Sequence, residues 1–383
     1  MPKHKILIVD SDAASRNFVA RKLQEQKFDI LQAGSAKEGL IFTWRDHPDL
    51  VIADPALPDL TGEEFAAKLR NDSRTEKIPL VALSSDHNPE RIKSCREAGF
   101  NEYITKSGQA ISTLNEVVNR FFGISEEVMK QGGLMIVFMS AKGGTGTSSI
   151  CANAASNLAK QKPESRVAVA DLVLPIGSIA SIIGYEGEQT ILSLAEKTSD
   201  ETDPDFLGRE LPFMETWQFN LLAGSTDPEL SSHLSSGRIW DFVTGLKSAY
   251  DYVFIDIGRS LSKITLPLVQ HADLLVVIVS TDVSTISLTG NMLEYLGSKG
   301  VKKDSIYTIL NRHTGPEGLD KRETESTLGV KVNTVIPYLS TNFGFANSQH
   351  CPFTIKFPND TTSIIFYESA QEMVALARKL REG

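Results

Sequence analysis

Residues 140–149 read SAKGGTGTSS, and this stretch decides how the larger part of the chain folds. It ends the apolar run LMIVFMS (134–140) and precedes the helix-like stretch ICANAASNLAKQ (150–161). A glycine-rich turn between a strand and a helix lets backbone N–H groups converge on an anion, and the helix dipole adds to the attraction. The stretch therefore predicts a phosphate-binding loop; a turn of the same kind without a ligand is the alternative.

The loop departs from the usual pattern of Gly, four residues, Gly-Lys and Ser or Thr. Thr147 stands at the lysine position, although Gly146 and Ser148 are in place, and a different lysine, Lys142, precedes the glycines. The predicted nucleotide-binding residues of the loop are Lys142, Gly143, Gly144, Thr145, Gly146, Thr147, Ser148 and Ser149.

Composition narrows the class of protein. The chain has 383 residues, of which 41% are hydrophobic, enough for two or three domains with full cores. A net charge of −9 argues against a general nucleic-acid binder, which usually has a basic face. Three scattered cysteines are typical of a reduced cytosolic protein. Because no signal peptide and no membrane-spanning run is evident, we expect a cytoplasmic location.

Strand and helix signals alternate in two blocks, at residues 1–121 and 134–383, with the polar stretch FGISEEVMKQGG (122–133) as the expected linker. Continuous apolar strands between helices predict parallel sheets covered on both faces. The fold class is therefore α/β, with two doubly wound domains. Strands are expected at 5–9, 29–33, 49–53, 79–83 and 102–105, and at 134–140, 166–171, 252–256, 274–280, 306–311 and 331–337.

Polar residues follow the strands of the first block. Asp10 and Asp12 follow the first strand, Asp54 the third, Ser84 the fourth and Lys106 the fifth. Strand ends of a doubly wound sheet converge at one edge, and clustered carboxylates there indicate a cation. Helix capping by Asp12 and a turn at Ser84 are the alternative interpretation.

This first block resembles the receiver domain of two-component response regulators. The matching segments are ILIVDSD, DLVIADPALPDLTG, PLVALSS and EYITKS. The resemblance implies a flavodoxin-like fold, with Asp54 as phospho-acceptor, Ser84 as switch hydroxyl and Lys106 as phosphate-sensing cation. Two positions depart from the family pattern, because Ser11 replaces a second adjacent acid and Ser107 replaces a proline.

The second block offers ligands for Mg²⁺. Asp256 ends the apolar strand DYVFID, as a second magnesium-linked acid does in this fold, and Ser148 can offer its hydroxyl. Gly258 lets a backbone amide approach a γ-phosphate. We therefore expect ATP and Mg²⁺ as cofactors, with Ser148 and Asp256 at the metal and with Asp54 and Asp10 as candidate ligands of a receiver metal.

Because Lys142 precedes the glycines of the loop, the second block resembles the deviant Walker ATPases of the MinD/ParA type. In that family a lysine equivalent to Lys142 crosses a dimer interface to the partner's nucleotide. The resemblance implies a P-loop NTPase-like domain and a base contact from Asn311 in ILNRHTG. It also implies that Asp171, Asp256 and Gly258 lie in the Walker B and switch segments, with Asp256 ending the Walker B strand. Matching segments also include RVAVADLVLPIGSIASIIG, YDYVFIDIGRSLSKITLPLVQHADLLVVIVSTD and VIPYLSTNFGFANSQHCPF.

Two substitutions predict slow hydrolysis. Thr147 removes the loop lysine, and Val173 stands where the family has a second acid that positions the attacking water. Each lost transition-state contact costs roughly 10²–10³ in rate. We expect ATP binding with negligible hydrolysis.

A receiver-like domain before such a deviant ATPase domain resembles the TadZ/CpaE family of Flp/Tad pilus assembly proteins. The resemblance implies a homodimer that places the pilus machine, often at a cell pole, through other Tad components. Nucleic acid is not an expected partner. The alternatives are an actively cycling positioning ATPase and a phosphorylation-controlled response regulator.

The C-terminal stretch SIIFYESAQEMVALARKLREG (363–383) has an apolar stripe at helical spacing. A membrane-binding amphipathic helix and a helix packed on the sheet both explain it. We favour packing, because basic residues occur only at the end of the stretch, where they complement the helix dipole. Membrane association is therefore expected to be weak or indirect, at the inner face through partners.

Overall fold

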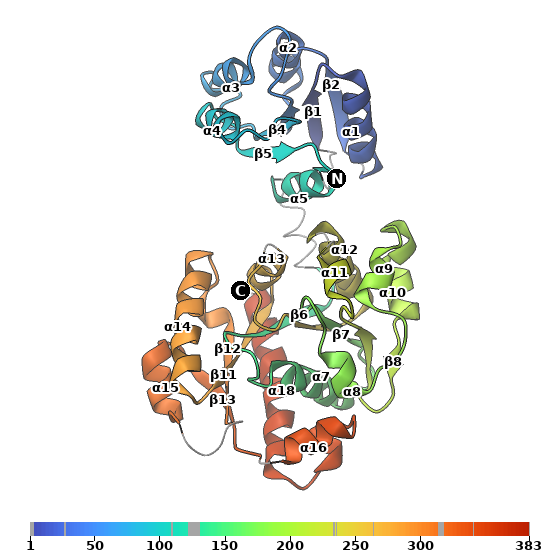
Figure 1. Ribbon diagram of the computed structural model, residues 1–383, viewed down its shortest axis with the longest axis vertical. Helices are drawn as coiled ribbons and strands as arrows, with labels where there is room; N and C mark the ends of the chain where they lie inside the picture. The colour runs from blue at the N-terminus through green and yellow to red at the C-terminus, as the bar shows by residue number, and fades with distance from the viewer. Residues whose placement is uncertain are drawn as a thin grey trace. The chain divides into compact units, whose positions relative to one another are not determined.

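The computed structural model describes residues 4–26, 28–108, 110–121, 131–232, 234, 236–262, 264–312, 318–339 and 341–382. The chain divides into two compact units, Met1–Glu127 and Val128–Gly383, which are drawn in Figure 1. Residues 122–130 of the expected linker lie outside the described residues.

The first unit is a parallel five-stranded sheet in the order β2-β1-β3-β4-β5. Its strands are β1 (Lys5–Val9), β2 (Asp29–Ala33), β3 (Leu50–Ala53), β4 (Leu80–Ser84) and β5 (Glu102–Thr105). Its helices are α1 (Ala13–Glu25), α2 (Ala36–Asp46), α3 (Gly62–Arg70), α4 (Pro89–Glu97) and α5 (Ala110–Phe121). Because the chain reverses direction across the sheet between β1 and β3, the ends of these neighbouring strands form the expected place for a site.

Two apolar layers hold the first sheet. One packs α1 and α5 on the face that carries Ile6 and Ile52. The other packs α2, α3 and α4 on the face that carries Leu7 and Val51. Strands buried on both faces explain the uninterrupted apolar runs in the sequence.

The second unit is an eight-stranded sheet in the order β13-β12-β11-β6-β10-β7-β9-β8. All its strand pairs are parallel except β8 with β9. The strands are β6 (Leu134–Ser140), β7 (Val167–Asp171), β8 (Phe213–Met214), β9 (Phe219–Leu222), β10 (Tyr252–Asp256), β11 (Leu274–Ser280), β12 (Ile306–Asn311) and β13 (Val332–Ile336). The two-domain, doubly wound α/β prediction is confirmed, and only the short edge pair β8–β9 was not expected.

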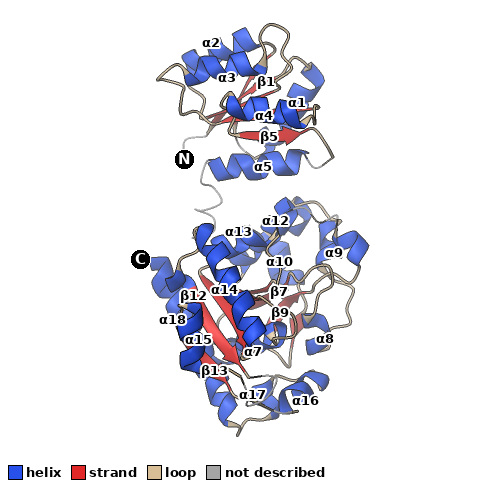
Figure 2. Ribbon diagram, turned by 60° about the vertical axis from the view of Figure 1, so that its left-hand side comes forward, coloured by secondary structure: helices blue, strands red, loops and turns tan. Residues whose placement is uncertain are grey.

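Helices cover both faces of this sheet (Figure 2). One face holds α7 (Thr147–Gln161), α8 (Ile179–Ile183), α16 (Asn342–Ser348), α17 (Phe353–Lys356) and α18 (Thr361–Glu382). The other holds α9 (Ile191–Ala195), α10 (Pro204–Glu210), α12 (Ser236–Ala249), α13 (Thr265–Gln270), α14 (Val283–Ser298) and α15 (Lys321–Leu328). The remaining short helices are η1 (Asp200–Thr202), α11 (Pro228–Ser231) and η2 (Lys303–Ser305).

The C-terminal helix α18 is part of the core. Its apolar stripe, which includes Phe366, Met373 and Ala377, is buried against the sheet and α7. Its last turn is fixed by Arg381, which donates to Asp273 and to the backbone oxygens of Gly132 and Gly133. The packed-helix interpretation is confirmed. Among the described residues, no helix combines the length and apolar character needed to cross a bilayer.

Candidate nucleotide site and receiver site

The phosphate loop connects β6 to α7 with two residues in the left-handed region. Gly144 has a φ of +79° and Gly146 a φ of +88°, a conformation that a side chain at either position would strain. A Cβ added to Gly143 or Gly144 would meet no described heavy atom within 4 Å. The loop therefore presents open space beside its backbone, at the N-terminus of a 15-residue helix, as an anion site requires.

Thr147 does not replace the missing lysine. Its hydroxyl lies 3.0 Å from the hydroxyl of Thr145, and both side chains are buried. The amide nitrogen of Asn311 donates to the backbone oxygen of Thr145 at 2.8 Å. Asn311, the predicted base contact, thus braces the loop from the end of β12.

Lys142 is held within its own chain. Its ammonium group lies 3.1 Å from Asp282 Oδ1 and 2.9 Å from Ser284 Oγ, at the start of α14. Burial works against the charge of Asp282, but hydrogen bonds from Thr285 and Ser284, with Lys142, hold its pKa well below the usual range. Sequence reasoning missed Asp282 and Ser284, which lie 140 and 142 residues further along the chain.

Asp171 and Asp256 are paired residues at the ends of the neighbouring strands β7 and β10. Both carboxylates are fully buried. Burial raises the pKa of Asp256 to about 7, and the neighbouring Asp171 adds to the effect. Burial also raises the pKa of Asp171 to about 6, although three backbone N–H groups oppose it. Two such acids favour a bound cation.

The two carboxylates differ in their hydrogen bonds. Asp171 accepts from the backbone of Val173, Ser178 and Ile179 at 2.7–3.1 Å, so it caps α8. Asp256 accepts from the Gly258 backbone through Oδ1. Within the part of the chain that the structure describes, its Oδ2 is buried and has no hydrogen-bond partner.

Ser148 is the second residue of α7. Its hydroxyl lies 2.7 Å from the hydroxyl of Ser178, a residue that sequence reasoning did not single out. Ser149 is occupied differently, because its hydroxyl accepts from the side chain of Asn347 at 2.8 Å.

The position of the missing second switch acid is filled by an apolar contact. A Cβ added to Gly258 would lie 3.2 Å from Val173 Cγ1, and Gly258 has a φ of +59°. Val173 therefore packs against the backbone that follows Asp256. It offers no group to orient water.

These residues fit a magnesium–nucleotide group. Among the described residues, Asp256 Oδ2 is a buried acceptor without a donor, and the Ser148 hydroxyl counteracts the raised pKa of that carboxyl. The open loop beside Gly143 leaves room for phosphate oxygens. The Mg²⁺ would bring two positive charges to the carboxylates and phosphates. Carboxylate, hydroxyl and phosphate oxygens are the ligands that this ion prefers.

In the first unit, Lys106 joins the two predicted acids. Its ammonium group lies 2.8 Å from Asp10 Oδ2 and 2.7 Å from Asp54 Oδ2. Burial works to lower the pKa of Lys106, but these hydrogen bonds outweigh it and raise the pKa. The strand-end prediction thus placed Asp10, Asp54 and Lys106 in one cluster.

The other predicted receiver residues take separate places. Asp12 accepts from the Ala14 backbone as the N-cap of α1, which is the capping alternative. Ser84 is buried at the end of β4, and its hydroxyl accepts from the Asp86 backbone. Tyr103, which the sequence did not single out, donates to the Asp86 backbone oxygen at 2.8 Å.

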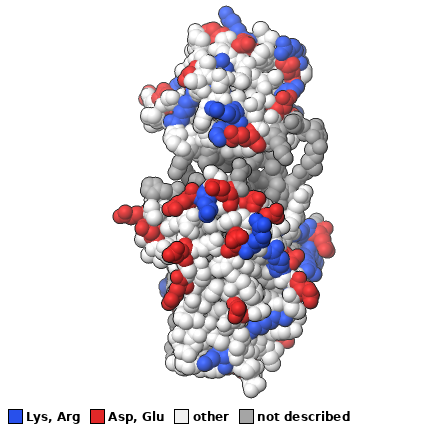
Figure 3. Space-filling model, turned by 90° about the vertical axis from the view of Figure 1, so that its right-hand side faces the viewer, with Lys and Arg blue, Asp and Glu red and all other residues white. Residues whose placement is uncertain are grey.

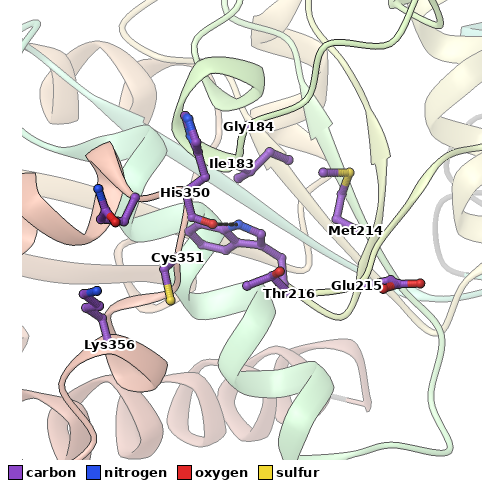
Figure 4. A pocket seen from close by; sticks show the side chains of 10 residues that line it. Ile183, Gly184, Met214, Glu215, Thr216, His350, Cys351 and Lys356 are labelled. Carbon is purple, nitrogen blue, oxygen red and sulfur yellow. Dashed lines mark hydrogen bonds between the residues drawn. The ribbon is translucent and has the colours of Figure 1, made fainter.

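A separate cavity of about 480 Å³ lies at the far end of α8. Figure 4 shows that its His350 and Cys351 side chains point in different directions, and the His350 ring lies 3.2 Å from the Ile182 backbone oxygen. None of the predicted site residues lines it. On the face drawn in Figure 3, basic and acidic side chains are interspersed.

The first unit has clear relatives. Residues 6–119 match the family model of the response regulator receiver domain. Over 106 residues the chain is 31% identical to the two-component response regulator ORR11 of Oryza sativa subsp. indica, covering 27% of this chain and 71% of that protein. The chain therefore belongs to the response regulator receiver family through this first unit.

The second unit shares its fold with solved structures of the MinD and ParA type. A ParA family ATPase from Chlorobium tepidum TLS matches 62% of this chain and 98% of its own, with a TM-score of 0.58 and 23% identity. The septum site-determining protein MinD complexed with Mg-ADP from Pyrococcus horikoshii OT3 matches 65% and 98%, with a TM-score of 0.55 and 18% identity. At these identities the likeness shows a common fold.

Proposed function

We propose that the second unit binds ATP with Mg²⁺, that two chains then join across the phosphate loops, and that hydrolysis is negligible. The single observation that carries this proposal is that the loop has Lys142 before its glycines and Thr147 at the usual lysine position. The long side chain of Lys142 is 44% exposed, whereas the Thr147 hydroxyl is turned inward to Thr145. Lys142 is therefore the cation that would reach the nucleotide of a second chain. The loop has no lysine at position 147 to contact the nucleotide of its own chain.

Low turnover follows from the same geometry. Thr147 and Val173 stand where two transition-state contacts would be needed, and each such loss costs roughly 10²–10³ in rate. The nucleotide then acts as a ligand that favours one association state through differential affinity. The MinD structure in complex with Mg-ADP supports an adenine nucleotide with Mg²⁺ as the ligand.

We further propose that the whole chain is a positioning protein of the TadZ/CpaE type in Flp/Tad pilus assembly. The order of the two units supports this role, since a receiver domain precedes a MinD/ParA-type fold with an altered phosphate loop. Its partners would be a second copy and other Tad components, with a cytoplasmic location that becomes polar through those partners. Deleting the gene in its own organism should abolish Flp-type pili or change their position; normal pili would contradict this role.

Light scattering at micromolar protein tests the nucleotide step. The chain should be a monomer alone and a dimer with Mg²⁺-ATP, and Lys142→Ala should remain a monomer. A mass that does not respond to ATP would contradict the proposal. Phosphate release by the wild type should not exceed that of Lys142→Ala; a clear excess would favour an actively cycling ATPase instead.

Phosphorylation control of the receiver is the second candidate function, and the contact of Lys106 with both Asp10 and Asp54 favours it. It is compatible with the first, because the two sites lie in separate units.

A further inference from the structure

Ser178 occupies the N-cap position of α8, yet its side chain makes no capping hydrogen bond in this fully described helix. Asp171 does the capping instead, by accepting from the backbone N–H groups of Ser178 and Ile179. Serine is common at this position because its oxygen usually accepts from the first turn. Here the hydroxyl is released from that task and directed elsewhere.

The Ser178 hydroxyl is directed at the magnesium candidate of the phosphate loop. Its Oγ lies 2.7 Å from Ser148 Oγ. Ser148 in turn is close enough to Asp256 for its hydroxyl to counteract the raised pKa of that carboxyl. The backbone N–H of Ser178 also donates to Asp171 at 2.7 Å, and Asp171 is the strand partner of Asp256. The two hydroxyls therefore lie beside the acidic pair, in which Asp256 Oδ2 has no donor among the described residues.

The spacing suits a shared cation. Mg²⁺ binds oxygen ligands at about 2.1 Å in octahedral geometry, so adjacent ligands lie about 3 Å apart. Two hydroxyls 2.7 Å apart need little movement to become neighbouring ligands of one ion. Asp256 Oδ2, buried without a donor among the described residues, supplies the negative charge that such an ion requires.

We propose that Ser178 is a second hydroxyl ligand of the Mg²⁺ that accompanies the nucleotide. This inference rests on the proposed binding of Mg²⁺-ATP to the second unit. Ser178 directly follows the loop 172–177, in which the side chain of Ile176 is 53% exposed. Ligation at Ser178 fixes this loop to the occupied site, so the surface around Ile176 reports whether Mg²⁺-ATP is bound without any hydrolysis.

The backbone just before Ser178 passes close to Asp171. A Cβ added to Gly177 would lie 2.7 Å from both Asp171 Oδ2 and Gly224 Cα, so the backbone passes close to the acid. Ser178→Ala therefore removes a hydroxyl without removing the cap of α8, because Asp171 and the backbone N–H groups remain. The folded structure of this variant should be retained.

A fluorescent ATP analogue titrated with Mg²⁺ and then with EDTA tests the inference. In the wild type Mg²⁺ should tighten binding of the analogue, and in Ser178→Ala this gain should shrink by about tenfold, with unchanged affinity in EDTA. Ser178→Thr keeps the hydroxyl and should restore the gain. Ser181→Ala is the matched control, because the Ser181 hydroxyl donates to the Ser178 backbone oxygen rather than to the Ser178 hydroxyl, and it should behave as wild type.

Hydrogen exchange of the peptide covering 172–183 gives a second measurement. Mg²⁺-ATP should slow exchange there in the wild type and in Ser178→Thr, but not in Ser178→Ala. The role of Ser178 would be overturned if Mg²⁺ tightened analogue binding equally in Ser178→Ala and the wild type. It would also be overturned if Ser178→Ala lost the same affinity for the analogue in EDTA as in Mg²⁺. If the wild type binds no analogue under either condition, the proposed nucleotide function fails, and this inference fails with it.

Discussion

The ammonium group of Lys142 lies 3.1 Å from the carboxylate of Asp282 in the same chain. The lysine that would serve a second chain is thus held by its own α14, with Ser284 as a further acceptor. Dimerisation across the phosphate loops requires Lys142 to exchange these contacts for phosphate oxygens of the partner. The strength of the intrachain contact therefore sets part of the cost of the dimer.

Replacing Asp282 with asparagine should strengthen the ATP-dependent dimer. Asparagine retains the N-cap of α14 but removes the charge that holds Lys142. Since the side chains of Lys142 and Asp282 are 44% and 34% exposed, the pair is worth no more than about 1 kcal/mol. Each dimer breaks two such pairs, one in each chain, so the dimer dissociation constant measured by analytical ultracentrifugation should fall by up to about 30-fold.

Salt gives the matched control for this contact. The difference between wild type and Asp282→Asn should shrink as ionic strength rises, because exposed pairs are screened. Lys142→Ala should remain monomeric in both backgrounds. A weaker dimer in Asp282→Asn would show that Asp282 supports the dimer.

Buried Asp256 should make the second unit less stable at alkaline than at acid pH. Burial raises the folded pKa values of Asp171 and Asp256 to about 6 and about 7, from an ordinary value of 3.8. Between pH 4 and 7 the folded state therefore holds more protons than the unfolded state, and the free energy of unfolding falls as pH rises through this window. Asp256→Asn should be more stable than wild type at pH 8, by on the order of 1–3 kcal/mol, and similar to it at pH 4.

Thermal unfolding with and without Mg²⁺-ATP at pH 8 separates this effect from a general change in packing. The ligand should raise the melting temperature of the wild type but not that of Asp256→Asn, which lacks the charge for the metal. A variant that is less stable than wild type at pH 8 would contradict the cost assigned to the buried carboxylate.

The sequence predicted the residues at strand ends well, because parallel strands bring their carboxyl ends to one edge regardless of detail. Lys106 lies within hydrogen-bonding distance of Asp10 and Asp54 for this reason. For the same reason Asp171 and Asp256 are neighbours at the ends of β7 and β10. The short strand β9 gave no such signal, since Asn220 interrupts its apolar run.

The partners of individual side chains could not be predicted in the same way. Lys142 and Asp282 meet only because β6 and β11 are neighbours, although they lie far apart in sequence. The Ser148–Ser178 contact depends on Asp171 capping α8. Either the Asp171 carboxylate or the Ser178 hydroxyl could accept the hydrogen bonds of the cap, and the sequence does not show which of them does. Thr147 turns inward because Thr145 offers it a buried partner.

The last turn of α18 should contribute to the stability of the second unit. Arg381→Ala removes hydrogen bonds to Asp273 and to the Gly132 and Gly133 backbone oxygens. Hydrogen bonds to charged groups contribute about 1.5–3 kcal/mol, so the free energy of unfolding in urea should fall by about 2 kcal/mol. Lys379→Ala, an exposed position in the same turn, should change it by less than about 0.5 kcal/mol. Equal urea midpoints for the two variants would contradict the role of Arg381.

Adding the second acid of the receiver site should make Asp54 easier to phosphorylate. Ser11 is exposed directly after Asp10, and Asp12 is occupied as the cap of α1. Within the described part of the chain, the carboxylates that contact Lys106 are those of Asp10 and Asp54. Ser11→Asp adds one charge beside Asp10 and should lower the Mg²⁺ concentration needed for phosphorylation by acetyl phosphate about tenfold. Intact mass measures the added phosphoryl group, which Asp54→Asn should lack. Equal Mg²⁺ requirements would show that the second acid is not limiting, and no phosphoryl group on either protein would leave the first unit as a docking module.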